Sequence, residues 1–276
     1  MDRLTDLFVV VVPLISVLFR SWSGFQDELA WCAAWLYAAT GEQQYLDKVS
    51  EKYFAIENAA GGGFSWDSKA GGALLLLYKL TKDEKYANGF KNYIGSWQGM
   101  KTTPKGLSFY SQWGANRYAA NTAFLALLGA DLGLNTDSFR AFGIKNINYI
   151  LGDCCGGVDP STNQPFFSYV IGYGNNYPRA PHHRSSSCWG PGNCPCGGGQ
   201  QAHPLYGAMV GGPGEWDDYT DSCQDYVHTA VATDYNAGFT SGVAAIKQFS
   251  VTKRLEGLEV SMDNVPIKKG NLGGRE

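Results

Sequence analysis

Apolar residues recur at helical spacing along most of this chain. Trp31, Ala34, Trp35 and Ala38 lie three or four positions apart, which places them on one face of a helix. That run ends at Gly41, a residue type that commonly follows the last turn of a helix. The same periodicity predicts about seven helices in all, and the further expected ranges are 45–54, 68–80, 83–96, 116–132, 137–151 and 237–249.

Short polar turns join most of these expected helices. Consecutive helices with short links pack as antiparallel neighbours, so the pattern predicts an all-α fold of helical hairpins in series, a solenoid or a toroid. Strand-like alternation is confined to short pieces at 106–110 and 167–171. Between residues 152 and 220 the helical pattern gives way to a long segment rich in Gly, Pro, Ser, Asn and Cys. A loop region of that length is usually a functional surface.

Composition limits the kinds of partner. With 276 residues, of which 44% are hydrophobic, the chain can bury a substantial core as one large domain or two small ones. Its 22 basic and 25 acidic residues leave a net charge of -3, so we expect no nucleic-acid partner. Aromatic residues make up 14%, including 8 Trp and 16 Tyr, which suits stacking on sugar rings, although aromatics also fill cores.

The first residues form an apolar leader. The apolar run at 7–19 is too short to cross a bilayer, so we expect no membrane span. One interpretation is a secretory signal, although Asp2 and Asp6 weaken the expected positive flank; the other is a buried segment or a gene-model artefact.

The cysteines allow two interpretations. The odd number of 7 Cys fits a secreted protein with some disulfides and leaves at least one thiol unpaired within the chain. Zinc coordination is the alternative, with Cys188, Cys194, Cys196 and His203 as ligands, but their spacing matches no standard zinc motif.

Five sequence segments carry a family resemblance. They are Ser-Trp-Ser-Gly-Phe-Gln-Asp-Glu-Leu-Ala-Trp at 21–31, Phe-Ser-Trp-Asp-Ser-Lys at 64–69, Trp-Gly-Ala-Asn-Arg-Tyr at 113–118, and two signature-like stretches at 168–184 and 219–237. Together they resemble glycoside hydrolase family 9, the family of many endo-β-1,4-glucanases. Within that family, the segments are most similar to those of animal members. The resemblance implies an (α/α)6 barrel, incomplete here, with long loops and a cleft for cellulose. It predicts a partial catalytic domain at 20–250 between the leader at 1–19 and a polar tail at 251–276.

The resemblance also implies an inverting reaction that needs two carboxylates, a general acid and a general base. Ala230 stands where the family has its acidic glutamate, and the sequence contains no Asp-Ala-Gly-Asp motif, which carries the base in the family. General-acid catalysis and general-base catalysis each raise the rate by a factor of about 10² to 10⁴. Because both groups are missing, we expect activity near background. Asp221 matches the family's active-site aspartate and His182 its active-site histidine. Rescue by a neighbouring carboxylate is the alternative, and the candidates are Asp221, Asp225 and Asp234.

The positions that bind substrate in the family are better preserved. By the resemblance, Trp22 and Trp113 are sugar-stacking platforms, hydroxyl groups are bound by Arg117, His182 and Arg184, and Tyr235 lines the same subsite. Core packing is the alternative for every Trp, and we expect it for Trp31 and Trp35. His203 and His228 are isolated in the sequence and are expected to be structural. Two further departures in the second signature are Cys223 in place of arginine and Thr229 in place of asparagine.

A structural calcium site is a further implication of the resemblance, with the residues Ser23, Gly24, Asp27, Glu28 and Asp67. Calcium prefers several hard oxygen ligands, which these residues can supply. The alternative is that Asp27 and Glu28 favour a helix N-terminus without any metal. No organic cofactor is expected.

Three functions remain open from the sequence. The chain is either a cellulose-degrading enzyme with impaired catalysis, or a non-catalytic protein that binds β-1,4-glucan such as cellulose or cello-oligosaccharides, or one half of an enzyme completed by a partner chain. By the resemblance, we expect a secreted protein.

Overall fold

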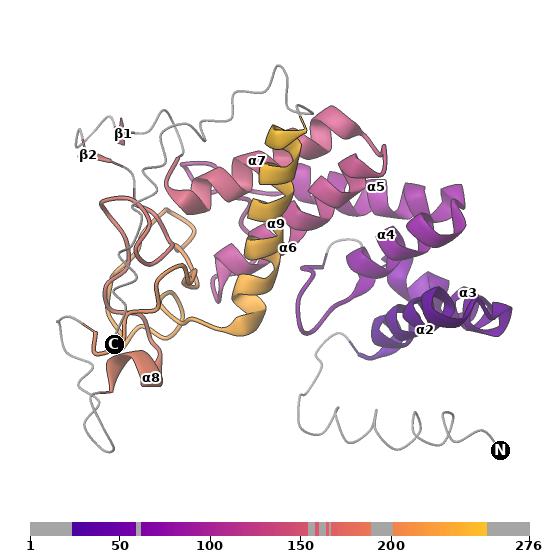
Figure 1. The fold of residues 1–276 in the computed structure, drawn as a ribbon, viewed down its shortest axis with the longest axis horizontal. Coiled ribbons are helices and arrows are strands. Elements are labelled where there is room, and N and C mark those ends of the chain that lie inside the picture. The colour runs from indigo at the N-terminus through magenta and orange to yellow at the C-terminus, as the bar shows by residue number, and fades with distance from the viewer. Residues whose placement is uncertain are drawn as a thin grey trace, which may run out of the picture. The chain divides into compact units, whose positions relative to one another are not determined.

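The computed structural model describes residues 24–58, 62–153, 158–159, 164–165, 167–188 and 201–252 (Figure 1). The apolar leader and nearly all of the polar tail lie outside these residues, as do Trp22 and Ser23. The described chain divides into two compact units. Unit 1 comprises Met1–Lys101 and Asn121–Phe142, and unit 2 comprises Thr102–Ala120 and Gly143–Glu276.

Helices dominate the described residues, which confirms the all-α class. In chain order they are α2 (Gln26–Thr40), α3 (Gln43–Asn58), α4 (Ala70–Thr81), α5 (Glu84–Gln98), α6 (Ala115–Asp131), α7 (Thr136–Leu151), the single turn α8 (Arg184–Ser187) and α9 (Thr233–Val251). The boundary between the two units falls within α6 and again within α7.

Local signals account for several helix ends. Gly41 follows α2 with a left-handed φ of 72° and donates its N–H to the Tyr37 carbonyl at 2.8 Å, as the sequence predicted. Asp83 caps α5 because its carboxylate accepts the Lys85 N–H at 2.9 Å. Helix α9 begins at Thr233, earlier than the predicted start at 237, since the apolar periodicity does not extend into the polar first turn that Asp234 and Asn236 help to form.

Strands contribute little to the described residues. A short antiparallel pair, β1 (Val158–Asp159) and β2 (Gln164–Pro165), was not predicted. The two strand-like pieces of the sequence form single bridges instead, Thr102 with Ser108 and Val170 with Met209.

In unit 1, α2 packs on α3 and α4, and α4 packs on α5. The large side chains that are fully buried in this unit are Trp97, Tyr93, Phe90, Phe139, Ile56, Leu74, Leu77, Ile94 and Leu127. Helix α2 carries apolar residues on several sides, but only one of its faces is packed against other helices. Trp35 is consequently 51% exposed, so the prediction that it lies in the core was wrong.

In unit 2, the described core centres on Leu107, Ile147 and Phe249. Helix α9 approaches α7 closely at Gly242, where an added Cβ would lie 2.9 Å from Ile147 Cδ1.

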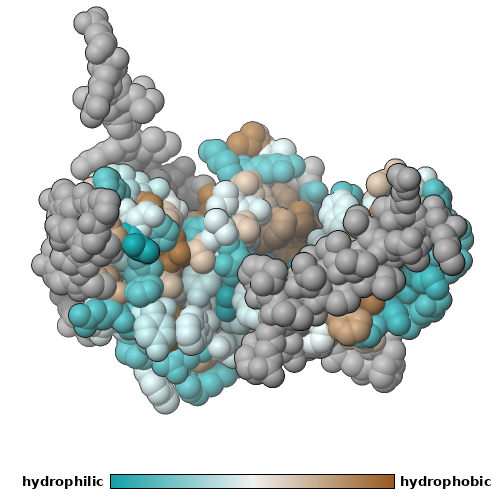
Figure 2. All heavy atoms as spheres, turned by 90° about the horizontal axis from the view of Figure 1, so that it is seen from below, coloured by the Kyte–Doolittle hydropathy of each residue, from teal (hydrophilic) through white to brown (hydrophobic). Residues whose placement is uncertain are grey.

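Hydrophobic residues are interspersed among hydrophilic ones on the face drawn in Figure 2. The exposed large hydrophobic side chains of unit 2 include Val251 and several aromatic residues, among them Trp113, Tyr206, Trp216 and Tyr226. Exposed aromatic rings in such number are a feature of binding surfaces.

Gly129 allows α6 to approach α5 within unit 1, because an added Cβ would lie 2.5 Å from Phe90 Cε1 and 3.3 Å from Phe139 Cδ2. We expect Gly129→Ala to lower the free energy of unfolding by about 1–3 kcal/mol through overpacking. Gly95→Ala is the matched control, since a Cβ there meets nothing within 4 Å, and it should raise stability by about 0.5–1 kcal/mol. Urea unfolding measures both effects, and equal effects of the two substitutions would contradict this packing.

Candidate active site

Three backbone segments of unit 2 meet around Ala230. The His182 N–H donates to the Thr229 carbonyl at 2.9 Å, and the two chains pair in parallel at His182 and Ala230. On the other side, the Gly211 N–H donates to the Ala230 carbonyl at 3.0 Å and the Gly212 N–H to the His228 carbonyl at 2.9 Å. The two signatures of the sequence are therefore joined through their main chains.

The His182 ring has a defined orientation. Its Nδ1 lies 2.6 Å from the Cys223 carbonyl oxygen, and because a carbonyl only accepts, Nδ1 must be the donor. In the neutral ring, Nε2 is then left as an acceptor on an exposed side chain. The arrangement suits the binding of a hydroxyl group.

Ala230 places a methyl group beside this histidine. The residue is half-buried, and its main chain is fixed by the pairing with His182 and Gly211. A methyl group has no proton to give, so position 230 cannot supply general-acid catalysis in its present form.

Asp221 anchors the loop that leads to His182. Its two carboxylate oxygens accept the main-chain N–H groups of Arg179 at 2.7 Å and Ala180 at 3.1 Å. Hydrogen bonds to an ionised carboxylate are the stronger kind. The described contacts of Asp221 therefore hold the loop in place, and its catalytic role stays a prediction.

Asp225 and His228 form a pair that the sequence analysis missed. Asp225 Oδ2 lies 2.8 Å from His228 Nδ1, and Oδ1 accepts the N–H groups of Val227 and His228 at 3.2 Å. Burial opposes ionisation of Asp225, but its hydrogen bonds with His228, the charge of His228 and the Val227 N–H together hold the pKa of Asp225 below its usual value. His228 was expected to be structural, and its ring makes this local contact with Asp225. The three-residue spacing of an acid and a histidine is the signal that could have revealed it.

Aromatic side chains form an exposed surface next to His182. Trp113 is 53% exposed and Tyr226 is 51% exposed, and their ring centroids lie 5.4 Å apart. The Tyr226 ring in turn lies 6.0 Å from the His182 ring. We call Trp113, Tyr226 and His182 the aromatic surface. Tyr226 was not singled out from the sequence, although its place between Asp221 and Ala230 in the second signature was an available signal.

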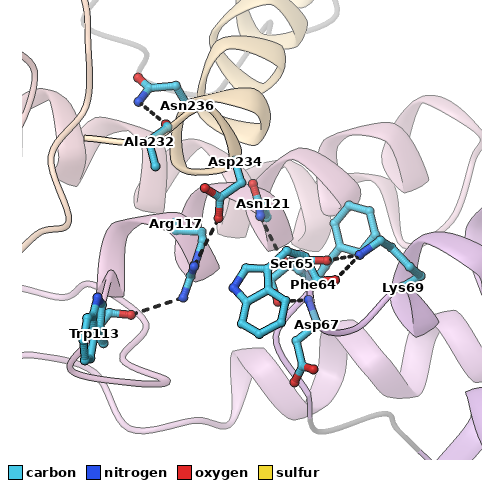
Figure 3. A network of polar contacts seen from close by, with 11 residues as sticks. Phe64, Ser65, Asp67, Lys69, Trp113, Arg117, Asn121, Ala232, Asp234 and Asn236 are labelled. Atoms are coloured by element: carbon cyan, nitrogen blue, oxygen red, sulfur yellow. Dashed lines mark hydrogen bonds and ion pairs between the residues drawn. The ribbon is translucent and has the colours of Figure 1, made fainter. Parts of the chain in front are cut away.

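Arg117 lies behind this surface and is 6% exposed. Its guanidinium donates to Asp234 at 3.1 Å and to the Trp113 carbonyl at 3.3 Å (Figure 3). The rings of Tyr118 and Tyr235 lie 4.3 Å and 4.8 Å from its central carbon. Arg117 thus positions Trp113 and the start of α9, and direct binding of a sugar by Arg117 stays a prediction.

Tyr235 is also more buried than a lining residue of a cleft, with 5% of its surface exposed. Its ring lies against Gly114, whose φ is 72° and where an added Cβ would come within 2.9 Å of the ring. Burial, opposed by the charge of Arg117, raises the pKa of Tyr235. Arg184 is exposed and begins α8, and the predicted platform Trp22 lies outside the described residues.

The acidic pair of the expected calcium site lies in unit 1. Asp27 is 5% exposed and accepts the Lys69 N–H at 2.6 Å, so it links α2 to the start of α4. Glu28 Oε2 is buried and accepts no hydrogen bond from the described residues. Burial, followed by the hydrogen bond and charge of Asp27, raises the pKa of Glu28 to about 8. Two adjacent acids with an unpaired buried oxygen fit a hard cation.

The loop at 64–69 lies close to this acidic pair through Lys69. Asn121 donates to the Phe64 carbonyl at 2.8 Å, and the Asp67 N–H donates to Ser65 Oγ at 3.2 Å. In Figure 3 the Asp67 carboxylate points away from the contacts of Ser65 and Lys69. Within the described residues no group of three or more His, Cys, Asp or Glu side chains is arranged to hold a metal.

Cys188 and Cys223 are disulfide-bonded, and Cys32 is a free thiol. Because a disulfide sulfur is not a thiolate, Cys188 does not fit the zinc alternative. Cys194 and Cys196 lie outside the described residues, and His203 contacts Ser186 through its main chain. Among the helices that the structure describes, none has the length and apolar character to cross a membrane.

Comparison with known proteins agrees with this arrangement of helices and signatures. The family model for glycosyl hydrolase family 9 matches residues 14–243, so the chain belongs to that family. Endoglucanase B of Cellulomonas fimi is 42% identical over 256 residues, covering 85% of this chain and 23% of the relative. An endoglucanase of Dictyostelium discoideum is 40% identical over 243 residues, covering 85% of this chain and 32% of the relative.

Solved structures of the family match as well. The endoglucanase of the termite Nasutitermes takasagoensis matches with a TM-score of 0.75 and 42% identity, over 85% of this chain and 53% of that chain. Endoglucanase CelQ of Clostridium thermocellum, complexed with cellobiose and cellotriose, matches with a TM-score of 0.71 and 34% identity, over 84% of this chain and 40% of that chain. The chain therefore spans about half or less of the length of these relatives. The structural matches confirm an all-α fold that corresponds to part of an (α/α)6 barrel.

The Asp225 and His228 pair predicts a pH dependence of stability. Because the folded pKa of Asp225 is lowered, its contribution is present above the unfolded value of about 3.9 and is lost as the pH falls through the folded pKa. Asp225→Asn should therefore be less stable than the wild type at about pH 7, and the difference should shrink below about pH 4. Urea unfolding across this range measures it, with Asp47→Asn on α3 as the control. A difference that is unchanged or grows on acidification would contradict the assignment.

Proposed function

We propose that this chain binds β-1,4-glucan on the aromatic surface and that hydrolysis is impaired by Ala230. The single observation that carries the proposal is the pairing of Ala230 with His182 beside the exposed rings of Trp113 and Tyr226. The membership in family 9 and the complex of CelQ with cellobiose and cellotriose support the class of ligand.

The chemistry of the surface suits a glucan. An exposed aromatic ring offers an apolar face to the C–H groups of a pyranose, and the acceptor Nε2 of His182 can bind a sugar hydroxyl. Arg117 fixes the main chain of Trp113, so less conformational freedom is lost on binding.

Rescue of catalysis by a neighbouring carboxylate is disfavoured. Asp221 accepts two main-chain N–H groups, Asp225 pairs with His228, and Asp234 pairs with Arg117. A general acid must direct its proton at the leaving oxygen, and each of these carboxylates is engaged in a contact elsewhere. We therefore propose glucan binding rather than hydrolysis as the function of this chain.

Binding and turnover are separable by experiment. We expect purified protein to bind cellotetraose in isothermal titration calorimetry, and Trp113→Ala to raise the Kd about tenfold or more because a stacking face is lost. Trp216→Ala is the matched control, since Trp216 is 72% exposed in the same unit but outside the aromatic surface. Release of reducing ends from carboxymethylcellulose should stay at the level of a protein-free blank. Sustained release by the wild type, or equal loss of affinity in both variants, would refute the proposal.

We also propose that Asp27 and Glu28, with the main chain near Gly24, hold a structural calcium ion. The support is the buried Oε2 of Glu28, which accepts no hydrogen bond from the described residues and lies beside the second acid, Asp27. When bound, the ion would neutralise the two acids at the start of α2. A secreted location is proposed as well, and the disulfide-bonded Cys188 and Cys223 support it.

Calcium should then raise thermal stability. At a calcium concentration about 100 times the Kd, binding adds about 2.7 kcal/mol, which moves the Tm by about 5–11 °C relative to EDTA. Glu28→Gln should abolish this increment, whereas Glu51→Gln on the exposed surface of α3 should retain it. The same Tm in calcium and in EDTA would show that the acids serve only the helix N-terminus.

A further inference from the structure

Unit 2 contains a pocket of ≈ 600 Å³, and none of the three residues of the aromatic surface lines it. Its lining includes Tyr177, Arg179, Pro181, Gln201, Tyr206 and Asp221. A volume of this size lies within the range of about 300–1,000 Å³ that small-molecule sites occupy.

The main chain beside Tyr206 is held by hydrogen bonds, and the Tyr206 side chain is 74% exposed. The Gly207 N–H donates to the Ile171 carbonyl at 2.8 Å, and the Ile171 N–H donates to the Ala208 carbonyl at 2.9 Å. The Tyr206 ring lies against Gly172, whose φ is 79° and where any Cβ would collide with the ring. A fixed ring with an uncovered face is a ready stacking platform.

The polar wall of the pocket is also held in place. The Arg179 guanidinium lies 4.6 Å from the Tyr177 ring and forms no ion pair with any described residue. The Asp221 carboxylate is fixed by the N–H groups of Arg179 and Ala180. A guanidinium and a carboxylate at one pocket offer hydrogen-bond donors and acceptors with little net charge.

Gln201 adds an oxygen that has no partner among the described residues. Its Nε2 donates to the Pro181 carbonyl at 3.1 Å, which fixes the amide. Its Oε1 is buried and accepts no hydrogen bond from the described residues. A buried acceptor without a donor is costly, so the pocket has a use for a hydroxyl group.

The mixture of groups narrows the ligand. Because Arg179 and Asp221 line the same pocket, it favours neither an anion nor a cation, and a purely apolar compound would leave Gln201 Oε1 without a donor. A neutral ring with several hydroxyls satisfies both the aromatic and the polar walls. We infer that this pocket is a second sugar-binding site, in which a pyranose stacks on Tyr206 and bonds to Arg179, Asp221 and Gln201. The identity of the sugar as β-1,4-linked glucose rests on the proposed function.

Titration calorimetry with cellobiose tests the site. The wild type should bind two molecules per chain, one at the aromatic surface and one in the pocket. Tyr206→Ala should weaken the pocket site at least tenfold and leave the other site unchanged, and Trp113→Ala should do the reverse. Tyr206→Phe keeps the stacking face and should bind as the wild type does, which controls for disturbed folding, and Arg179→Ala should weaken only the pocket site.

The outcomes separate the two proposals. Binding that survives Tyr206→Ala and disappears in Trp113→Ala would overturn the pocket site and leave the proposed function standing. Binding that disappears in Tyr206→Ala and survives Trp113→Ala would support the pocket site and overturn the role of the aromatic surface. An absence of cellobiose binding in the wild type would overturn both.

Discussion

The main-chain hydrogen bonds on both sides of Ala230 are the constraint on which the candidate site depends. They join the segment at 228–230 to His182 on one side and to Gly211 and Gly212 on the other. Thr229 adds its side chain to this pairing, since its hydroxyl lies 3.2 Å from the His182 N–H and 2.8 Å from the Asp225 carbonyl. The side chain of residue 230 takes no part in these bonds, so the site keeps its shape without a carboxylate there.

Acidic residues in unit 2 serve this scaffold. Asp221 holds the main chain before His182, Asp225 orders the turn that contains His228, and Asp234 fixes Arg117 behind Trp113. A carboxylate that binds main-chain N–H groups or a cation in this way stabilises the fold. These three carboxylates therefore all take part in contacts that order the loops of unit 2.

The sequence predicted most of the fold, because helical periodicity reports burial directly. The seven expected helices all occur, and the start of α9 was missed only because a polar first turn lacks that periodicity. Trp35 was misjudged because periodicity shows that a face is apolar but not whether anything covers it.

The site was predicted less completely. The resemblance identified His182, Asp221 and Ala230, but the hydrogen bonds that join them depend on a fold that brings distant segments together, and spacing alone does not reveal it. Tyr226 and the pair of Asp225 and His228 were missed because each residue type is common in structural roles. The pocket at Tyr206 could not be predicted, because its lining residues come from separate loops and only the fold brings these loops together.

The free thiol of Cys32 has a practical consequence. It lies half-buried on α2, and burial raises its pKa, so little reactive thiolate is present at neutral pH. Alkylating reagents should modify it slowly in the folded protein and quickly once α2 unfolds. The rate of labelling at this one position therefore offers a local readout of the integrity of unit 1, independent of any sugar or metal.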